Sequence, residues 1–499
     1  MQIDMKYNIR LICLFAVLGS LLSCNRWLDI TPEDTITEKQ LFQDAGGYHS
    51  AINGLYQSMS SASLYGENLT WGFLSALSQN YDNASNNNSM RFSHTEKYEY
   101  GSDEVKAFGE DIWQAAFNVI ANSNNILKHL ESADMSIFPL YEKGEVDMIA
   151  GEAIAIRALL HFDLLRLFSV SPAVDMDAKA IPYVETFPEY FSERLTNRQV
   201  LDKIITDLHK SGELLAKYDT TTTGLLMMSS TGNRLRMDNS NGGLFFNSRG
   251  TRLNYFSVLA LLSRVYLYQG NNEKAFEYAK KIEKYIRNAD NWFFYTKRGF
   301  SAQDSEEFRP HKLIDELLVA FYEDELTNKY IAKAVSSDSP YKLKNLSWVF
   351  KDADDYRYVK LVHTITPEVK ISLKYLRRSE AGSDIIKIEN RLIPIMRISE
   401  IHLILAECLA KKGNIPEAVA YLKKLRTARG CIANALDSSM SENDFYAALD
   451  AEIIRENIAE GQYFFYCKRI NAATINNGGV YVPMEGKYTL EIPNSQTTF

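Results

Sequence analysis

The sequence predicts a mostly helical protein, built on tetratricopeptide-like helical hairpins with one irregular, loop-rich face for a ligand. Three observations support this fold class. Long segments place apolar residues at helical spacing, one helix–turn–helix pattern occurs twice, and a segment rich in Asn, Asp and aromatic residues separates the two copies. With 46% hydrophobic and 24% charged residues, the composition is that of an ordinary globular protein.

The first 23 residues predict a signal peptide for export. Lys6 and Arg10 precede an uncharged, largely apolar stretch, which is much shorter than the roughly 20 residues of a membrane-spanning helix. The stretch ends in residues 21–24 (LLSC), the pattern of a bacterial lipoprotein cleavage site. We therefore expect Cys24 to begin the mature chain, residues 24–499, and to carry the lipid that anchors it. The alternative is an ordinary secretory signal in which the cysteine is incidental.

Three segments in the first half of the chain predict long helices with an apolar face. Residues 111–130, 147–168 and 200–215 place apolar side chains three and four residues apart. Trp113 falls within the first of these patterns and is expected to be structural. Between residues 218 and 252 the pattern gives way to Thr, Gly, Asn and Ser, which predicts a long excursion over the surface.

An internal repeat is the strongest architectural signal in the chain. Residues 262–282 and 405–425 align without a gap, and both copies carry a Gly-Asn pair where one helix should end. A small residue, Ala275 or Ala418, follows in the second helix and allows the two backbones to approach closely. This pattern predicts two tetratricopeptide-type hairpins, which bracket a loop-rich insertion at about residues 288–390.

The sequence shows no signature of an enzyme or a nucleic-acid-binding protein. The motifs GxSxG, HExxH, GxxxxGK[ST] and GxGxxG are absent, and the eight histidines lack metal-ligand spacing. We therefore expect no catalytic residues, no cofactor and no metal. The net charge is −8 and no block of Lys and Arg stands out, which argues against nucleic acid as a partner.

Aromatic residues beside amides and carboxylates suggest a sugar-binding site instead. Sugars present apolar C–H faces and rings of hydroxyls, so their sites combine flat aromatic surfaces with hydrogen-bonding side chains. Three loop-like segments, distant in sequence, contain both kinds of residue. The candidate glycan-binding residues are Trp71, Tyr81, Asn83, Trp292, Tyr295 and Trp348. The alternative for any one of these aromatics is a small core beneath a loop.

Short motifs occur in order along nearly the whole mature chain. They are residues 27–32 (WLDITP), 151–158 (GEAIAIRA), 394–400 (PIMRISE), 426–430 (RTARG) and 455–461 (RENIAEG). In this order, behind a lipoprotein signal, they resemble the SusD/RagB family of outer-membrane nutrient-binding lipoproteins from the Bacteroidetes. The segment 462–466 (QYFFY) departs from that family, which commonly carries an Arg, an aromatic residue and an Asp-Leu pair there.

The resemblance implies a function as well as a fold. The protein would be lipid-anchored at the outer membrane on the cell surface, and it would bind a glycan or, less often, a peptide without a cofactor. It would deliver this nutrient to a TonB-dependent, SusC-like barrel transporter, on which it sits as a hinged lid. Two alternatives stay open: a membrane-anchored tetratricopeptide-type scaffold for protein assembly, and a surface glycoside hydrolase with paired carboxylates.

Overall fold

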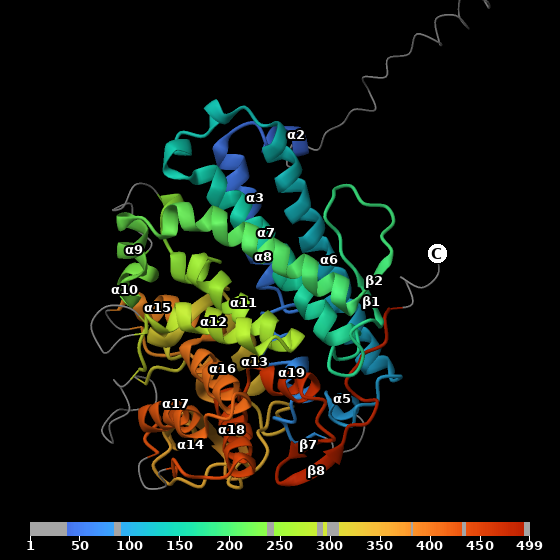
Figure 1. The fold of residues 1–499 in the computed structure, drawn as a ribbon, viewed down its shortest axis with the longest axis vertical. Helices are drawn as coiled ribbons and strands as arrows, with labels where there is room; N and C mark the ends of the chain where they lie inside the picture. The colour runs from blue at the N-terminus through green and yellow to red at the C-terminus, as the bar shows by residue number, and fades with distance from the viewer. Residues whose placement is uncertain are drawn as a thin grey trace, which may run out of the picture.

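The computed structural model is mostly helical, as the sequence predicts (Figure 1). The structure describes residues 37–83, 91–236, 244–286, 293–296, 309–380, 383–431 and 436–493. The predicted signal peptide, Cys24 and Trp292 lie outside the described residues.

Four long helices form the N-terminal part of the scaffold. They are α3 (Ala45–Met59), α6 (Asp103–Ser132), α7 (Glu145–Phe168) and α8 (Asn197–Asp219). The last three confirm the helices predicted from the apolar spacing. Ser102 and Thr196 begin α6 and α8, because their side chains accept hydrogen bonds from backbone N–H groups in the first turn. α7 packs between α6 and α8 and is buried along most of its length, consistent with apolar residues on all its sides.

The packing of these helices depends on the large side chain of Trp113 and on the lack of a side chain at Gly151. Trp113 is buried and meets Phe168 edge to face, with ring centroids 4.9 Å apart, which confirms its structural role. Gly151 allows α7 to approach α8 closely. A Cβ atom at this position would lie only 2.8 Å from Cγ of Leu215.

The repeated pattern forms two helical hairpins, as predicted. The first joins α11 (Tyr255–Gln269) to α12 (Asn272–Glu283), and the second joins α16 (Ile398–Lys411) to α17 (Ile415–Ala428). Between the helices, Gly270 and Gly413 adopt φ of 90° and 78°, a left-handed conformation that favours glycine. α12 packs against α16, so the two hairpins lie side by side, with α11 and α12 near the middle of the molecule and α16 and α17 below them (Figure 1).

Ala275 and Ala418 should not tolerate larger side chains. Both are fully buried, and the backbone carbonyl of Ala275 accepts a hydrogen bond of 2.9 Å from the Ser263 hydroxyl on the facing helix. We expect Ala275→Leu or Ala418→Leu to lower the free energy of unfolding by about 1–3 kcal/mol through overpacking. Urea unfolding of each variant measures this loss. Glu273→Leu, on the exposed side of α12, is the control. An unchanged unfolding midpoint for both alanine variants would contradict close packing.

The predicted surface excursion from residue 218 to 252 is only partly irregular, so this expectation is corrected. It contains α9 (Thr222–Met228) and α10 (Thr231–Arg234), and 3₁₀ turns lie at Leu244–Phe246 and Arg249–Thr251. The Thr and Ser residues that indicated a loop are helix caps. Thr221 accepts a hydrogen bond from the Gly224 N–H, and Ser230 accepts one from the Asn233 N–H.

Four two-stranded antiparallel sheets complete the described fold. The pairs are β1 (Lys179–Pro182) with β2 (Arg194–Thr196), β3 (Leu317–Tyr322) with β6 (Leu392–Arg397), β4 (Val362–Thr366) with β5 (Val369–Ser372), and β7 (Thr474–Asn477) with β8 (Val480–Pro483). The β3–β6 pair, in which Phe321 faces Ile393 across the ladder, ties the segment between the two hairpins to the start of α16.

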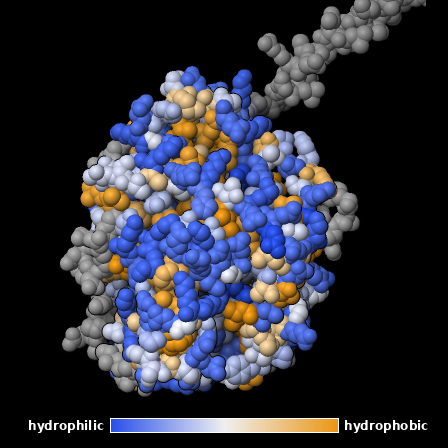
Figure 2. Space-filling model, in the orientation of Figure 1, coloured by the Kyte–Doolittle hydropathy of each residue, from blue (hydrophilic) through white to orange (hydrophobic). Residues whose placement is uncertain are grey.

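The remaining helices are short or lie near the ends of the chain. They are α2 (Glu38–Leu41), α4 (Phe73–Leu77), α5 (Ser93–Glu96), α13 (Leu326–Ala334), α14 (Tyr356–Val359), α15 (Asp384–Asn390), α18 (Glu442–Glu456) and α19 (Gln462–Arg469). Further 3₁₀ turns lie at Met135–Ile137, Tyr141–Lys143, Ile314–Glu316 and Leu373–Tyr375. Within the described part of the chain, no helix has the length and apolar character needed to span a bilayer. The face shown in Figure 2 is mainly hydrophilic, with scattered hydrophobic patches.

Candidate functional site

Two segments that the sequence marked as ligand-binding meet in the fold, although about 260 residues separate them. Tyr81 forms an isolated antiparallel bridge with Leu343. On either side of this bridge, the Asp82 N–H donates to the Lys342 carbonyl, and the Lys344 N–H donates to the carbonyl of residue 80, both at 3.0 Å. The end of the first segment therefore runs along residues 342–344 of the second.

The large aromatics of this junction face inward, so Trp71 and Tyr81, two of the predicted glycan-binding residues, do not present their rings to a ligand at the surface. Trp71 is 0% and Tyr81 1% exposed. The Trp71 ring lies 5.0 Å from the ring of Tyr330 and 5.1 Å from that of Tyr341, which also meets Tyr81 edge to face at 5.5 Å. These side chains form an aromatic core, because later parts of the chain cover the rings with further aromatics.

Asn83 is also buried, which corrects its interpretation as a glycan contact. Its Nδ2 atom donates to a carboxylate oxygen of Glu96 and to the Pro340 carbonyl, both at 2.8 Å. Its backbone N–H donates to the other oxygen of the same carboxylate at 3.0 Å. This amide therefore joins α5 to the segment before Tyr341 and has no face directed to solvent.

Tyr295 and Trp348 are half-buried, but the structure places them in different surroundings. The Tyr295 hydroxyl lies 2.6 Å from Nδ1 of His402 on α16, and the Arg429 guanidinium lies 5.0 Å from its ring. Burial raises the pKa of this hydroxyl well above its usual value. Trp348 instead packs against Gly479 in the β7–β8 turn. Trp348 follows directly on the segment that meets Tyr81, whereas Tyr295 contacts the hairpin scaffold.

A cleft of about 280 Å³ opens at the junction of the two segments. Its walls come from Asp82, from residues 342–346, from Tyr358 on α14, and from Val362, Pro367, Glu368 and Lys370 of the β4–β5 hairpin. The volume is close to the lower end of the range typical of small-molecule sites, about 300–1,000 Å³. In Figure 1 these segments lie in the lower half of the molecule, near α14 and the β7–β8 hairpin.

The cleft combines aromatic, cationic and amide groups. One face of the Tyr358 ring stacks on Phe350, with centroids 5.1 Å apart, and the Lys370 ammonium lies 5.6 Å from the Tyr358 ring. Lys342 lies 3.3 Å from the Asp82 carboxylate. Asn345 is exposed at the rim. An aromatic ring flanked by an amide, a carboxylate and an ammonium group can bind a polyhydroxylated ligand.

Lys344 is the most buried charged residue of the cleft wall. Its ammonium donates to Oε1 of Gln79 at 2.7 Å and lies 3.6 Å from the Glu96 carboxylate. Burial lowers its pKa, although the Glu96 carboxylate opposes this shift. This lysine therefore serves to hold the wall in place more than to contact a ligand.

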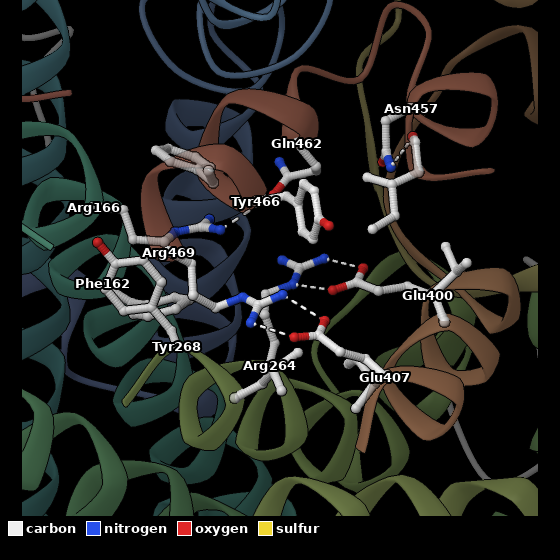
Figure 3. Close-up of a pocket in the computed structure, with 15 residues that line it drawn as sticks. Phe162, Arg166, Arg264, Tyr268, Glu400, Glu407, Asn457, Gln462, Tyr466 and Arg469 are labelled. Carbon is white, nitrogen blue, oxygen red and sulfur yellow. Dashed lines mark hydrogen bonds and ion pairs between the residues drawn. The ribbon is translucent and has the colours of Figure 1, made fainter. Parts of the chain in front are cut away.

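A second, smaller cleft of about 90 Å³ lies between α7, α11, α16 and α19 (Figure 3). Its polar side chains already form ion pairs with one another. Arg264 binds Glu400 and Arg469 binds Glu407, each with a shortest N–O distance of 2.6 Å. Arg166 donates to Gln462 at 3.2 Å. The Arg264–Glu400 pair joins the two hairpins to each other, and the Arg469–Glu407 pair joins the second hairpin to α19. The larger cleft is therefore the better candidate for a ligand site.

Comparison with known proteins identifies the family to which this fold belongs. The family described as "Starch-binding associating with outer membrane" matches residues 27–224, and the SusD family matches residues 371–495. The chain belongs to the SusD family. A relative, SusD-like protein P2 of Formosa agariphila, is 27% identical over 215 residues, which cover 42% of this chain and 38% of that protein. The aligned region thus spans well under half of this relative.

Solved structures share the SusD fold over nearly the whole described chain. A SusD superfamily protein from Bacteroides thetaiotaomicron is 22% identical, with a TM-score of 0.66 over 91% of this chain and 97% of that one. A putative sugar binding protein from Bacteroides vulgatus is 20% identical, with a TM-score of 0.67 over 91% and 96%. A laminarin binding SusD-like protein is 15% identical, with a TM-score of 0.60 over 91% and 97%.

The family motifs of this SusD chain build the scaffold and not the cleft. Glu456 accepts from Arg429 at 2.7 Å, from Arg397 at 2.7 Å and from Arg357 at 2.8 Å, and all four side chains are buried. Burial raises the pKa of the Glu456 carboxyl, but the three guanidiniums together hold it well below its usual range. Likewise Glu152, in the motif of residues 151–158, is buried and pairs with Arg249 and Arg252.

The cleft residues that the sequence analysis missed fall into two groups. Asp82, Asn345 and Tyr358 lie in or beside the segments that were marked for their aromatic and amide content. Lys342 and Lys370 carry no signal in the sequence. They reach the cleft only because the chain pairs with Tyr81 and because β4 and β5 form a hairpin.

Proposed function

We propose that this SusD-family protein is an outer-membrane lipoprotein that binds an oligosaccharide and delivers it to a TonB-dependent, SusC-like transporter. The family is carbohydrate-binding and outer-membrane associated. The observation that carries the proposal is the 280 Å³ cleft, in which Asp82 meets Asn345 and Tyr358 from a segment about 260 residues later. A sugar ring would lie against the Tyr358 ring, while the amide and carboxylate bind its hydroxyls.

Truncating the cleft aromatic should weaken glycan binding selectively. We expect Tyr358→Ala to cost about 1–3 kcal/mol of binding free energy, with a smaller effect on stability because the ring is half-buried. Calorimetric titration against a panel of oligosaccharides that includes laminarin fragments measures the affinity. Tyr141→Ala, on an exposed turn, is the matched control. Equal affinities for the wild type and Tyr358→Ala would place the binding site elsewhere. Incubation with the same panel tests for cleavage products, which a glycoside hydrolase would release.

The lipid anchor is tested separately. We expect Cys24→Ala to leave the protein folded but released from the membrane, because the acyl chains supply the membrane affinity and the core does not depend on them. Fractionation of cells that lack the partner transporter, followed by circular dichroism of the released protein, measures both effects. If the variant still sediments with outer membranes in such cells, the lipid on Cys24 is not the anchor.

A further inference from the structure

The loop between β1 and β2, residues 183–193, carries two unusually exposed aromatic side chains. Tyr190 is 93% exposed and Phe191 is 70% exposed, the two highest values among the large hydrophobic side chains of the described residues. The loop projects from the edge of the molecule beside α6 (Figure 1). Exposed aromatics that lie together at a protein surface mark interaction sites more often than single exposed hydrophobic residues do.

The base of this loop is held firmly by buried side chains from the helices. The Val184 N–H donates to Nε2 of His161 on α7 at 3.0 Å, and Nδ2 of Asn124 on α6 donates to the Val184 carbonyl at 3.0 Å. Arg157 donates to the Glu185 carbonyl at 3.3 Å. Burial lowers the pKa of His161 to about 3, so the imidazole is neutral and can accept this bond. The scaffold therefore fixes where the loop leaves the surface.

The tip of the loop is ordered by its own polar contacts. One carboxylate oxygen of Glu189 accepts from the Thr186 hydroxyl at 2.5 Å, and the other accepts from the Phe191 N–H at 3.3 Å. These bonds fix the backbone at the tip, from which the Tyr190 and Phe191 rings project into solvent. A backbone segment that is already fixed loses less freedom when it binds a partner, which favours binding.

The charges around the aromatic pair define the chemistry of its partner. Glu189 and Glu193 flank the pair and are exposed. Three cations lie beside the loop or at its base. Lys203 pairs with Glu185, Arg194 donates to backbone carbonyls of β1, and the Lys128 ammonium lies 5.7 Å from the Phe187 ring. Two exposed carboxylates disfavour an anionic membrane surface, and they also disfavour the same loop of a second copy. They fit a protein surface with an apolar pocket bordered by Lys or Arg.

We propose that residues 183–193 form a docking loop, through which the protein binds the transporter of the proposed function. The inference rests on that function. It adds the loop that makes the contact and the kind of transporter surface that this loop fits, an apolar pocket bordered by Lys or Arg. In Figure 1 the loop lies in the upper half of the molecule with α3 and α6, whereas the segments of the glycan cleft lie in the lower half. A contact at the loop can therefore persist while the cleft end moves toward or away from the transporter.

Co-purification from cells tests the docking loop. The full-length, lipidated protein is expressed with an affinity-tagged SusC-like, TonB-dependent transporter of the same organism. We expect Tyr190→Ser combined with Phe191→Ser to reduce the amount of protein recovered with the transporter at least tenfold, with unchanged glycan affinity and melting temperature. Leu226→Ser combined with Leu244→Ser, which removes two exposed side chains elsewhere, is the matched control and should leave recovery unchanged.

The charge argument is tested by Glu189→Lys combined with Glu193→Lys, which keeps the aromatic pair and should also reduce recovery. Recovery of the loop variants equal to that of the wild type overturns the inference, as does stronger recovery after the charge reversal. If the wild type binds phosphatidylglycerol vesicles, and the aromatic variant loses this binding but is still recovered with the transporter, the loop binds lipid. That result also overturns the inference. If the wild type itself is not recovered, the transporter is not the partner, and glycan titration then decides separately whether the binding function stands.

Discussion

Glu456→Gln is expected to lower the free energy of unfolding by about 3–5 kcal/mol, because it removes the charge that three buried guanidiniums share. Arg357, Arg397 and Arg429 all donate to this carboxylate, and all three are buried. The amide keeps the size of the side chain, so the loss reports the charge and not a cavity. Urea unfolding at pH 7 measures it. Glu442→Gln, in the exposed first turn of the same helix α18, should cost no more than about 1 kcal/mol.

The pH dependence of the unfolding free energy of the wild type and of Glu456→Gln gives a second test. The pKa of Glu456 is lowered in the folded state, so its contribution to stability is fully present above the pKa of an unfolded Glu, about 4.3. It is lost progressively as the pH falls below that value. The difference in unfolding free energy between the wild type and Glu456→Gln should therefore be constant from pH 7 to pH 5 and shrink in more acidic solution. A difference that grows on acidification would contradict the assigned direction.

Trp71→Ala is expected to cost about 3–5 kcal/mol of stability, because it empties the centre of a closed aromatic cluster. The ring is 0% exposed and meets Tyr330 and Tyr341 within about 5 Å, and the Tyr81 hydroxyl donates to the backbone carbonyl of the same tryptophan. Glycan affinity of the molecules that remain folded should change little. Melting curves and calorimetric titrations of the same preparation separate the two effects.

Trp348→Ala is the matched control for this experiment. Its ring is half-buried against the β7–β8 turn, so its removal should cost less stability than that of the fully enclosed Trp71. A Trp71→Ala protein with unchanged stability but weakened glycan binding would restore the interpretation of this residue as a ligand platform.

The helical scaffold was predictable because its signals are local. Apolar spacing marks α6, α7 and α8 within single segments, and the Gly-Asn turns mark both hairpins through a backbone conformation that few other residues adopt. Each of these features is read from fewer than 30 consecutive residues. The same local signals failed between residues 218 and 252, where Thr221 and Ser230 begin short helices instead of extending a loop.

The candidate site was less predictable because burial is decided by distant residues. Nothing near Trp71 in sequence reveals that Tyr330, Tyr341 and Tyr375 will cover it. Asn83 beside Tyr81 looked like a ligand contact, but its amide binds the backbone of residue 340. The combination of an aromatic and an amide is equally suited to a sugar and to a buried junction, and the sequence alone does not distinguish them.

Family motifs carry information about the fold and little about the ligand. Arg397, Arg429 and Glu456 each lie in one of the family motifs, and together they form a buried network. Arg157 pairs with Asp207 at 2.7 Å in a second network. A buried ion pair fails when either member is changed alone, so its members must be kept together. The cleft side chains Asn345 and Tyr358 bear no such constraint, and they are free to differ between proteins that bind different sugars.

The bridge between Tyr81 and Leu343 also sets the time at which the cleft can form. The chain is made from its N-terminus, so Asp82 emerges about 260 residues before its partner Lys342. Helices α3 to α12 can assemble in that interval, since they precede the second strand of the bridge. The segment that carries Trp71 stays without its aromatic cover throughout it. A chain that stops before residue 340 would therefore keep much of the scaffold, expose apolar rings and bind no sugar.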